Sequence, residues 1–412
     1  MGPSATVAIN DRSDELLVGG RDVCKLGLGQ SPFPVPEPVV DALREHAHQK
    51  AYLPTRGLAE LRAAVADYHR RSQELEVDAA DVLIGPGSKE LMFLLQLVYY
   101  GDIVIPTPAW VSYAPQAQII GRHVSWVRAH REDGWRLTPQ QLDHLCSNDP
   151  DRPRILVLNY PSNPTGGTYG QAELEELADL ARRYGVLVLS DEIYSELHHE
   201  GRHWSIARAY PEGTIVSAGL SKWCGAGGWR LGTFAFPPAL AWLRESIVAV
   251  ASETYTSTAA PIQYAAITAF EGGAELEDYL ARSRVVVRAL GRWVADHLNG
   301  AGIDTASPEG AFYVFPDLSD RAESLARRGI HTSTGLCSAV LDDIGVATLP
   351  GANFGRAADE LTLRIAYVDF DGAAALAGVA DLDGQPADEA FVREHCGAVV
   401  TAIERLCDWV NG

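Results

Sequence analysis

The sequence Val186-Leu187-Val188-Leu189-Ser190-Asp191-Glu192-Ile193-Tyr194 begins with four apolar residues in a row. A run that does not alternate with polar residues is typical of a strand buried on both faces. Other short runs are separated by segments with helical spacing, and they lie at Val82-Leu83-Ile84, Asp102 to Ile105, Ile155 to Leu158, Thr214 to Ser217 and Leu231 to Phe236. This alternation predicts an α/β fold.

The pattern changes after about residue 275. Ala274 to Leu298 has the spacing of one long helix, and the segments after it predict a strand at Phe312 to Phe315, a helix at Ser333 to Asp343, strands at Val346 to Leu349 and Leu361 to Ala366, and a last helix at Asp388 to Trp409. We therefore expect three parts: residues 1–45 as an N-terminal segment that joins the small domain, residues 46–290 as a large domain, and residues 291–412 as a smaller α+β domain.

The composition excludes some classes of function. The 412 residues contain 34 Lys and Arg against 54 Asp and Glu, a formal net charge of −20, which argues against a general nucleic-acid binder. No stretch reaches the roughly 18 apolar residues needed to span a bilayer, and Met1 to Gly20 lacks the apolar region of a signal peptide. The 6 cysteines are scattered without a C-x-x-C pair, which indicates reduced thiols. We expect a cytoplasmic protein without a membrane or nucleic-acid partner.

Two residues stand where chemistry is often found. Lys222 lies in the glycine-rich loop Gly219-Leu220-Ser221-Lys222-Trp223-Cys224-Gly225-Ala226-Gly227-Gly228-Trp229-Arg230. A lysine in a partly desolvated pocket has a lowered pKa and can form a Schiff base, although most loop lysines are simply solvated. Asp191 follows a buried strand, at the strand end where α/β sheets place their ligands. Its carboxylate suits a cationic ring nitrogen, and the alternative is a helix N-cap.

Three further segments hold groups that bind oxygen atoms. Gly85-Pro86-Gly87-Ser88-Lys89 opens a helix after a strand, where free N–H groups bind phosphate, although its spacing is not the Walker pattern. Asn163-Pro164-Thr165-Gly166-Gly167 forms a loop by turn chemistry alone, and the Asn163 side chain can donate to a phenolic oxygen. Arg364 is either an odd outward arginine on a strand or a buried clamp for a carboxylate.

Taken in this order, these segments resemble the class I/II aminotransferases, which are pyridoxal-phosphate enzymes of fold type I. The resemblance extends from Pro3 to the strand that holds Arg364, and its most specific pieces are Asn163-Pro164-Thr165-Gly166, Ser190-Asp191-Glu192-Ile193-Tyr194, and Ser221-Lys222 with Gly228-Trp229-Arg230. It implies a large domain that binds pyridoxal 5'-phosphate on a mostly parallel central sheet flanked by helices, with a smaller α+β domain beside it. The implied activity is transfer of an amino group between an amino acid and a 2-oxo acid.

The resemblance implies a role for each matching residue around the cofactor ring. Lys222 would hold pyridoxal phosphate as an aldimine and then move the proton between the substrate's α-carbon and the cofactor. Asp191 would keep the pyridine nitrogen protonated, which makes the ring an electron sink. Asn163 and Tyr194 would hydrogen-bond the phenolic oxygen of the ring, and Trp110 would stack on the ring.

Other matches lie at the phosphate, at the substrate and between subunits. The residues at the phosphate end are Gly87, Ser88, Lys89, Ser221 and Arg230. Those near the substrate are Gly29, Trp110, Asn163 and Arg364, of which Arg364 would bind the α-carboxylate. Tyr52 would reach the phosphate of the other subunit's cofactor, which implies a homodimer.

The start of the chain, Pro3-Ser4-Ala5-Thr6-Val7-Ala8-Ile9-Asn10, is similar to the bacterial aspartate and aspartate/prephenate aminotransferases. In that subgroup a threonine and a lysine help to bind the distal carboxylate of the substrate, and Thr6 and Lys89 stand at the matching positions. The resemblance therefore implies an aspartate- or glutamate-like L-amino acid and its 2-oxo acid as substrates. The alternative is that Lys89 only supports the phosphate or pairs with Glu90.

Three places depart from the family pattern. Gly219 stands where many relatives carry a phosphate-binding serine, which weakens that contact or shifts it to Ser221. The segments Trp223 to Gly227 and Tyr367 to Ala387 also differ from the usual sequence. They motivate an alternative function with the same cofactor, namely a β- or γ-elimination, replacement or cyclisation in a specialised biosynthetic pathway.

Two hypotheses from other classes are weaker. A ligand-binding module without catalysis gives no reason for an intact Lys222 and Asp191. A metal site requires a suitable group of ligands, and the histidine cluster has no tetrahedral spacing; its members are His198, His199 and His203, near Glu196 and Glu200. We interpret this cluster as an exposed polar loop and expect no metal.

Overall fold

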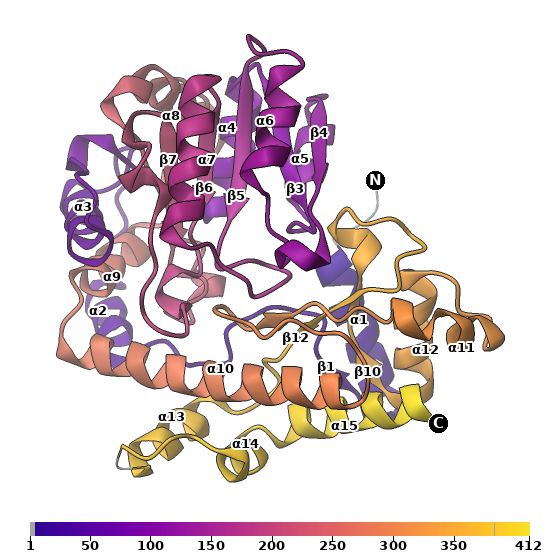
Figure 1. Ribbon diagram of the computed structural model, residues 1–412. Coiled ribbons are helices and arrows are strands. Elements are labelled where there is room, and N and C mark those ends of the chain that lie inside the picture. The colour runs from indigo at the N-terminus through magenta and orange to yellow at the C-terminus, as the bar shows by residue number, and fades with distance from the viewer. Residues whose placement is uncertain (1–4, 383) are drawn as a thin grey trace.

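A seven-stranded sheet forms the centre of the larger part of the molecule (Figure 1). The computed structural model describes residues 5–382 and 384–412, with side chains from residue 7 onward. The strands of this sheet are β2 (Val82–Gly85), β3 (Asp102–Thr107), β4 (Val124–Arg128), β5 (Arg154–Asn159), β6 (Leu187–Asp191), β7 (Thr214–Gly219) and β8 (Gly232–Ala235). Their order is β2-β8-β7-β6-β5-β3-β4, and β8 runs in the direction opposite to the other six strands. The predicted α/β fold with a mostly parallel central sheet is confirmed.

Helices cover both faces of this sheet, which explains why its strands lack polar alternation. The covering helices are α4 (Ser88–Val98), α5 (Tyr113–Ile119), α6 (Pro139–Ser147), α7 (Gln171–Arg183) and α8 (Ala241–Thr254). On β5, Ile155 and Val157 share a hydrophobic cluster with α4 and α8, whereas Leu156 and Leu158 share another with α6 and α7. Figure 1 shows α6 and α7 in front of the sheet. Successive residues of one strand therefore anchor opposite helical layers.

The remaining strands belong to a smaller part of the molecule, which meets the carboxyl edge of the large sheet. They are β1 (Cys24–Lys25), β9 (Tyr313–Val314), β10 (Val346–Ala347), β11 (Leu349–Pro350) and β12 (Leu363–Ala366). Strand β1 pairs with β10 in parallel, although the two lie at opposite ends of the sequence. Strands β11, β12 and β9 form an antiparallel sheet.

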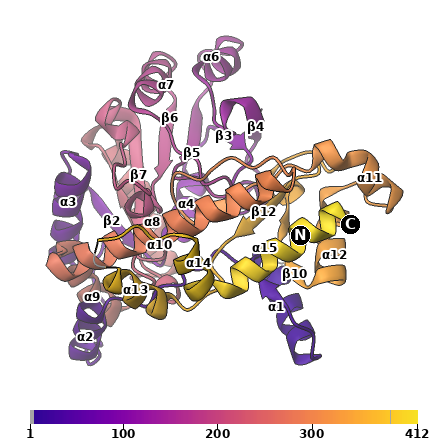
Figure 2. The ribbon, with the colours of Figure 1, turned by 60° about the horizontal axis from the view of Figure 1, so that its bottom comes forward.

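Helix α10 (Ala274–Gly300) lies along both parts of the molecule, as Figures 1 and 2 show from two sides. Its 27 residues span about 40 Å at 1.5 Å per residue. At its start it lies near the packed helices α2 (Glu37–His46), α3 (Ala59–Gln73) and α9 (Ala260–Glu271). The helices of the smaller part are α1 (Ala5–Val18), α11 (Ala322–Arg327), α12 (Ser333–Ile344), α13 (Gly372–Asp381), α14 (Glu389–His395) and α15 (Gly397–Asn411).

Several local expectations differ from the structure. The expected last helix, Asp388 to Trp409, is two helices, because α14 ends at His395 and α15 begins at Gly397. Glycine is a poor helix former, while the apolar period continues across the break. The expected boundary between residues 290 and 291 falls inside α10. Helices α1 and α13 occupy segments for which the sequence predicted no element.

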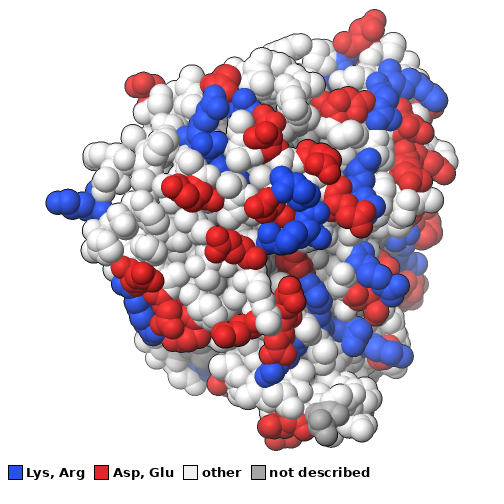
Figure 3. Space-filling model, turned by 90° about the vertical axis from the view of Figure 1, so that its left-hand side faces the viewer, with Lys and Arg blue, Asp and Glu red and all other residues white. Residues whose placement is uncertain are grey.

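The surface of the molecule is strongly charged but mixed in sign. On the face shown in Figure 3, acidic and basic side chains intermingle over the right-hand part of the view and are sparser over the left-hand part. Many of the arginines pair with nearby carboxylates, for example Arg182 with Glu212 at 2.6 Å and Arg393 with Glu404 at 2.8 Å. Within the described residues, no helix has both the length and the apolar composition to cross a membrane.

Candidate active site

A cavity of about 490 Å3 lies between the carboxyl edge of the large sheet and the smaller part. Pockets for small molecules and cofactors measure about 300–1,000 Å3. Strands β5 and β6 end beside it at Asn159 and Asp191, as expected for parallel strands whose carboxyl ends share one edge. The structure brings most of the sequence-predicted residues to its wall, namely Gly29, Ser88, Lys89, Trp110, Asn163, Asp191, Tyr194, Ser221, Lys222, Arg230 and Arg364.

The Asp191 carboxylate is buried at the end of β6. The Tyr113 hydroxyl donates a hydrogen bond to Oδ2 over 2.5 Å, whereas Oδ1 is buried without a partner among the described residues. Burial raises the pKa of Asp191 to about 6, against the hydrogen bond from Tyr113 and the charge of Lys222, which lower it. A buried carboxylate oxygen without a donor is costly, so this position suits the N–H of a cationic ring.

The Lys222 amine lies in the same cavity, just after β7. Its Nζ donates a hydrogen bond to the Gly29 carbonyl over 2.6 Å and lies 5.6 Å from the centre of the Tyr194 ring. Burial and the charge of Arg364 lower the pKa of Lys222 to about 8, against the charge of Asp191. Such an amine is partly neutral near pH 8, and a neutral amine is the form that attacks a carbonyl group.

The start of α4 and Arg230 form an anion-binding end of the cavity. The first N–H groups of α4, beginning at Ser88, have no partner within the helix. Gly87 precedes them at a φ of 92°, and a Cβ at Gly87 would lie 2.2 Å from Arg230 Nη2. Glycine at this position therefore lets the guanidinium approach the helix start. Arg230 Nη1 donates to the Gly227 carbonyl over 3.0 Å. These donors suit a phosphate group.

Arg364 is buried on β12 and faces the Asn163 loop. Its Nη1 donates to Asn163 Oδ1 over 3.2 Å, and its Nη2 donates to the Gly27 carbonyl. Its Nε is buried without a partner in the described part of the chain. The Asn163 backbone N–H donates to Asn159 Oδ1 over 2.8 Å, which fixes the loop against β5. A buried guanidinium with a spare donor at a cavity wall suits a carboxylate ligand.

Lys89 and Trp110 form another part of the wall. Lys89 Nζ lies 5.2 Å from the centre of the Trp110 ring, within the range of a cation–π contact. Burial and the charge of Arg230 lower the pKa of Lys89. Among the described residues, Glu90 does not pair with Lys89 and is not among the groups that shift its pKa. The Lys89 amine is therefore available to a ligand at this wall.

Three predicted residues lie outside the cavity wall. Gly87 is behind it, beside Arg230. Tyr52 is 90 % exposed, on the loop between α2 and α3. Thr6 belongs to α1, but its side chain and the preceding residues Pro3 and Ser4 lie outside the described part of the structure.

Most residues of the places that depart from the family pattern lie away from the cavity, whereas Gly227, the last residue of one departing segment, is part of its wall. A Cβ at Gly219 would lie 2.7 Å from the Leu231 carbonyl oxygen, so a serine does not fit this backbone, and Ser221 lines the cavity instead. Cys224 and Tyr367 are fully buried and are not part of the wall. Among the described residues, the departing segments therefore reach the cavity wall at Gly227.

The interpretation of the histidine cluster as an exposed loop is wrong. His199 is buried, and its Nδ1 lies 3.0 Å from the Pro308 carbonyl oxygen. His203 Nε2 lies 2.8 Å from Oε2 of the buried Glu192, and Oε1 of the same carboxylate accepts a hydrogen bond from Ser205 over 2.5 Å. These imidazoles satisfy buried oxygen acceptors, a requirement that sequence spacing does not show. In the described chain no group of three or more His, Cys, Asp and Glu side chains is placed to hold a metal ion.

Among the wall residues that sequence reasoning missed, three hold a predicted residue in place. Tyr113 holds Asp191, Tyr313 lies against Tyr194, and Asn159 anchors Asn163. Each has an ordinary local sequence, and the partners of the two tyrosines are distant in the chain. Only Asn159, as the last residue of a predicted strand next to the Asn163 loop, carried a signal that could have been used.

Comparisons with known proteins agree with this geometry. The family model "Aminotransferase class I and II" matches residues 21–374. Aspartate aminotransferase of Bacillus sp. is 32% identical over 375 residues, with 89% of this chain and 92% of the relative covered. Aspartate/prephenate aminotransferase of Thermus thermophilus is 33% identical, with 86% and 89% covered. A solved structure of Thermus thermophilus aspartate aminotransferase with maleate has a TM-score of 0.84 at 29% identity, with 99% and 97% covered.

The chain belongs to the class I and II aminotransferases. It is a pyridoxal-phosphate-dependent transferase of fold type I. Two observations fit this cofactor independently of the comparisons. The Asp191 Oδ1 atom is buried without a partner in the described part of the chain, and the space at Gly87 accommodates the Arg230 guanidinium at the anion-binding end.

Proposed function

We propose that this aminotransferase transfers the amino group of a dicarboxylic L-amino acid, aspartate or glutamate, to a 2-oxo acid. The observation that carries the proposal is that two cations, Arg364 and Lys89, line the cavity that holds Lys222. Arg364 would bind the α-carboxylate, and Lys89, with Thr6 as a second group, would bind the distal carboxylate. Relatives named aspartate aminotransferase, and the related structure with maleate, a dicarboxylate, support this substrate class.

The residues that would hold pyridoxal phosphate fall into two sets. Asp191, Asn163, Tyr194 and Trp110 would hold the ring, and the phosphate would be held by Gly87, Ser88, Ser221 and Arg230. The free Oδ1 of Asp191 supports the first set, and the approach of Arg230 at Gly87 supports the second. When bound, the cofactor supplies an electron-withdrawing ring.

Lys222 is the amine to which the cofactor would bind, and it is also the base. Its Nζ takes the proton from the α-carbon of an amino acid held by Arg364. A pKa of about 8, set by burial and by the charge of Arg364, lets this amine both lose and regain a proton near neutral pH. The Gly29 carbonyl accepts a hydrogen bond from Nζ, which fixes the direction of the amine in the wall.

The exposed ring of Tyr52 supports a homodimer in which this side chain reaches the partner's cofactor. A large aromatic side chain that is 90 % exposed in its own chain suits an interface between subunits.

The division into residues 1–45, 46–290 and 291–412 also stays a proposal. Its second boundary, between residues 290 and 291, lies within helix α10. The free thiols, five of them buried, support a reducing compartment such as the cytoplasm.

The visible absorption spectrum of the purified protein tests the function. Addition of L-aspartate or L-glutamate alone should remove the band of the bound cofactor, produce that of its aminated form, and release a 2-oxo acid. A response to other amino acids but to neither of these would contradict the substrate class.

Lys222→Ala tests the assigned base. The variant should lose transamination by at least about 1,000-fold, because it lacks both the attachment amine and the base. Lys50→Ala, which removes an exposed lysine, is the matched control and should keep the wild-type rate. Transamination that persists in Lys222→Ala would contradict the assignment of Lys222 as the base.

A further inference from the structure

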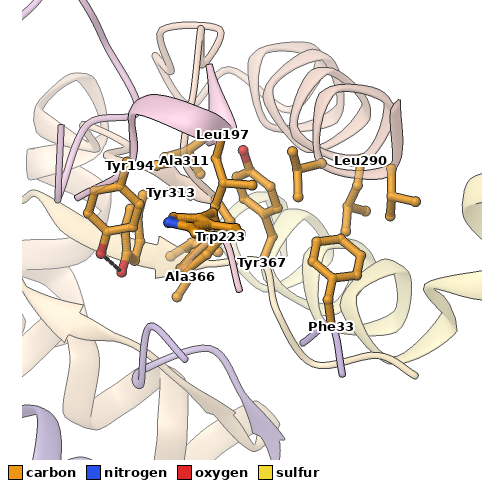
Figure 4. Close-up of a cluster of buried hydrophobic side chains, with 14 of the residues drawn as sticks. Phe33, Tyr194, Leu197, Trp223, Leu290, Ala311, Tyr313, Ala366 and Tyr367 are labelled. Carbon is orange, nitrogen blue, oxygen red and sulfur yellow. Dashed lines mark hydrogen bonds between the residues drawn. The ribbon is translucent and has the colours of Figure 1, made fainter. Parts of the chain in front are cut away.

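Tyr313 is a buried tyrosine of β9 to which the proposed function assigns no role. Its hydroxyl oxygen lies 2.7 Å from that of Tyr194, and either oxygen can be the donor. The two rings meet edge to face with their centres 5.6 Å apart. Figure 4 shows this pair at one end of a cluster of buried side chains that also includes Tyr367. Both Tyr313 and Tyr194 line the cavity.

Tyr313 also contacts the groups that surround the substrate. A Cβ at Gly29 would lie 2.0 Å from the Tyr313 hydroxyl oxygen, so the hydroxyl occupies the space that a side chain at position 29 would need. The guanidinium carbon of Arg364 lies 4.9 Å from the centre of the Tyr313 ring. Tyr313 therefore touches the carboxylate-binding arginine and the segment that accepts a hydrogen bond from Lys222.

The protons of the two hydroxyls restrict how the pair can be used. Burial raises the pKa of Tyr194 and of Tyr313, so both phenols keep their protons at neutral pH. A phenol carries one proton to donate. If Tyr194 donates its proton to the phenolic oxygen of the cofactor, it can only accept at the 2.7 Å contact, and Tyr313 is the donor. The other acceptor near Tyr313, the Gly29 carbonyl, is more distant at 3.5 Å.

We propose that Tyr313 is a positioning residue of the transamination site, whose hydroxyl donates to Tyr194 and thereby directs the Tyr194 proton toward the cofactor. This inference rests on the proposed function, because it requires a cofactor oxygen in front of Tyr194. Tyr313 acts through Tyr194. Its contact with Arg364 places the same ring beside the substrate carboxylate.

The experiment is a pH titration of the visible absorption of the holoenzyme without substrate. Tyr313→Phe removes the hydroxyl and keeps the ring. Tyr194 then donates more weakly, more negative charge stays on the cofactor's phenolic oxygen, and that oxygen holds a nearby proton more tightly. The midpoint of the spectral change should rise by about half to one pH unit, the equivalent of one ordinary hydrogen bond. Thermal unfolding of the same sample shows that the variant is folded.

Tyr367→Phe is the matched control. Tyr367 belongs to the same cluster and is equally buried, but its hydroxyl has no partner among the described residues. The midpoint of the spectral change in Tyr367→Phe should equal that of the wild type. An unchanged midpoint in Tyr313→Phe, or equal shifts in both variants, would overturn the inference.

A double-mutant cycle tests the route through Tyr194. Tyr194→Phe alone should raise the midpoint, and adding Tyr313→Phe to it should produce no further rise. Additive shifts would overturn the proposed route. A wild-type protein without a cofactor band would instead overturn the proposed function, and this inference with it, so the two failures are distinguishable.

Discussion

A tyrosine on a neighbouring helix favours the ionised form of Asp191. Tyr113 is the first residue of α5, and its hydroxyl donates to Asp191 Oδ2 over 2.5 Å. Burial alone favours the protonated carboxyl group. The hydrogen bond favours the carboxylate, which is the form that can pair with a cationic ring nitrogen.

Removal of this hydroxyl should change how cofactor binding depends on pH. Burial raises the pKa of Asp191 to about 6, and the hydrogen bond from Tyr113 keeps it from rising further. Tyr113→Phe removes that hydrogen bond and should therefore raise the pKa. Affinity for pyridoxal phosphate requires the carboxylate and is lost as pH falls through this pKa. The midpoint of that loss should move upward by about one pH unit, the effect of a hydrogen bond to a charged group.

Titration of the apoenzyme with pyridoxal phosphate between pH 5 and pH 8 measures this midpoint. Tyr99→Phe, a change in the same hydrophobic cluster away from Asp191, is the control and should leave it in place. An unmoved midpoint in Tyr113→Phe would show that the hydroxyl does not tune the carboxylate.

The residues that could be predicted from the sequence are those whose local context already limits their role. Asp191 ends a predicted strand, and Lys222 lies in a glycine-rich loop after another. Tyr113 and Tyr313 could not be predicted, because each acquires its role from a partner more than 70 residues away. Long-range contacts of this kind leave no spacing in the sequence.

At the scale of elements, the start of α4 combines backbone N–H groups and an arginine side chain in one anion-binding site. Gly87 precedes the helix at a positive φ and leaves room for Arg230, whose own φ of 54° is unusual for a residue with a side chain. Both backbone conformations lower the stability of the folded protein somewhat, because they lie in sparsely populated regions of φ and ψ. They place a guanidinium beside the free N–H groups of a helix, where an anion interacts with both.

Gly87→Ala should weaken cofactor binding by about tenfold, because its Cβ pushes the guanidinium away from the helix start. Gly121→Ala is the matched control, since Gly121 has a φ of 68° but open space around a Cβ. Both variants should lose about 1 kcal/mol of stability from backbone strain. Only Gly87→Ala should lose affinity for pyridoxal phosphate, as measured by absorbance titration.

Pyridoxal without a phosphate gives a second comparison for this element. Its affinity should change much less in Gly87→Ala than that of pyridoxal phosphate. Equal losses for both ligands would assign the effect to the ring end of the cavity and not to the anion-binding end.

Elements were predicted well where an apolar period and a boundary signal agreed. Strand β6 and helix α4 follow the expected segments within a few residues. The prediction placed one continuous helix at the end of the chain, because the apolar residues keep their spacing across Cys396. In the structure the backbone at Cys396 leaves the helical region, so the segment forms two helices. Gly397 begins the second helix, and α14 before the break packs against α10 and α13, so a poor helix former and tertiary packing coincide at this point.

At the scale of the whole molecule, the proposed dimer makes each active site depend on two chains. Lys222 lines the cavity of its own chain, whereas Tyr52 is not part of that wall and is 90 % exposed. A two-fold dimer would then hold two equal sites, each with Lys222 from one chain and Tyr52 from the other.

Mixing two inactive variants tests this arrangement. Tyr52→Ala and Lys222→Ala should each have low activity alone. After joint unfolding and refolding in equal amounts, half of the dimers are mixed, and each mixed dimer has one intact site. The mixture should recover about one quarter of the wild-type rate. Each variant unfolded and refolded alone is the control. An absence of recovered activity in the mixture would contradict a site shared between chains.

The pairing of β1 with β10 has a consequence for synthesis of the chain. Cys24 and Val346 are partners, and 346 − 24 = 322 residues separate them. A ribosome that adds about 5–20 residues per second takes roughly 16–64 s to deliver the second strand after the first. During that time the N-terminal strand has emerged without its partner. A nascent chain arrested before residue 346 therefore presents this segment to chaperones and proteases, whereas a released chain conceals it.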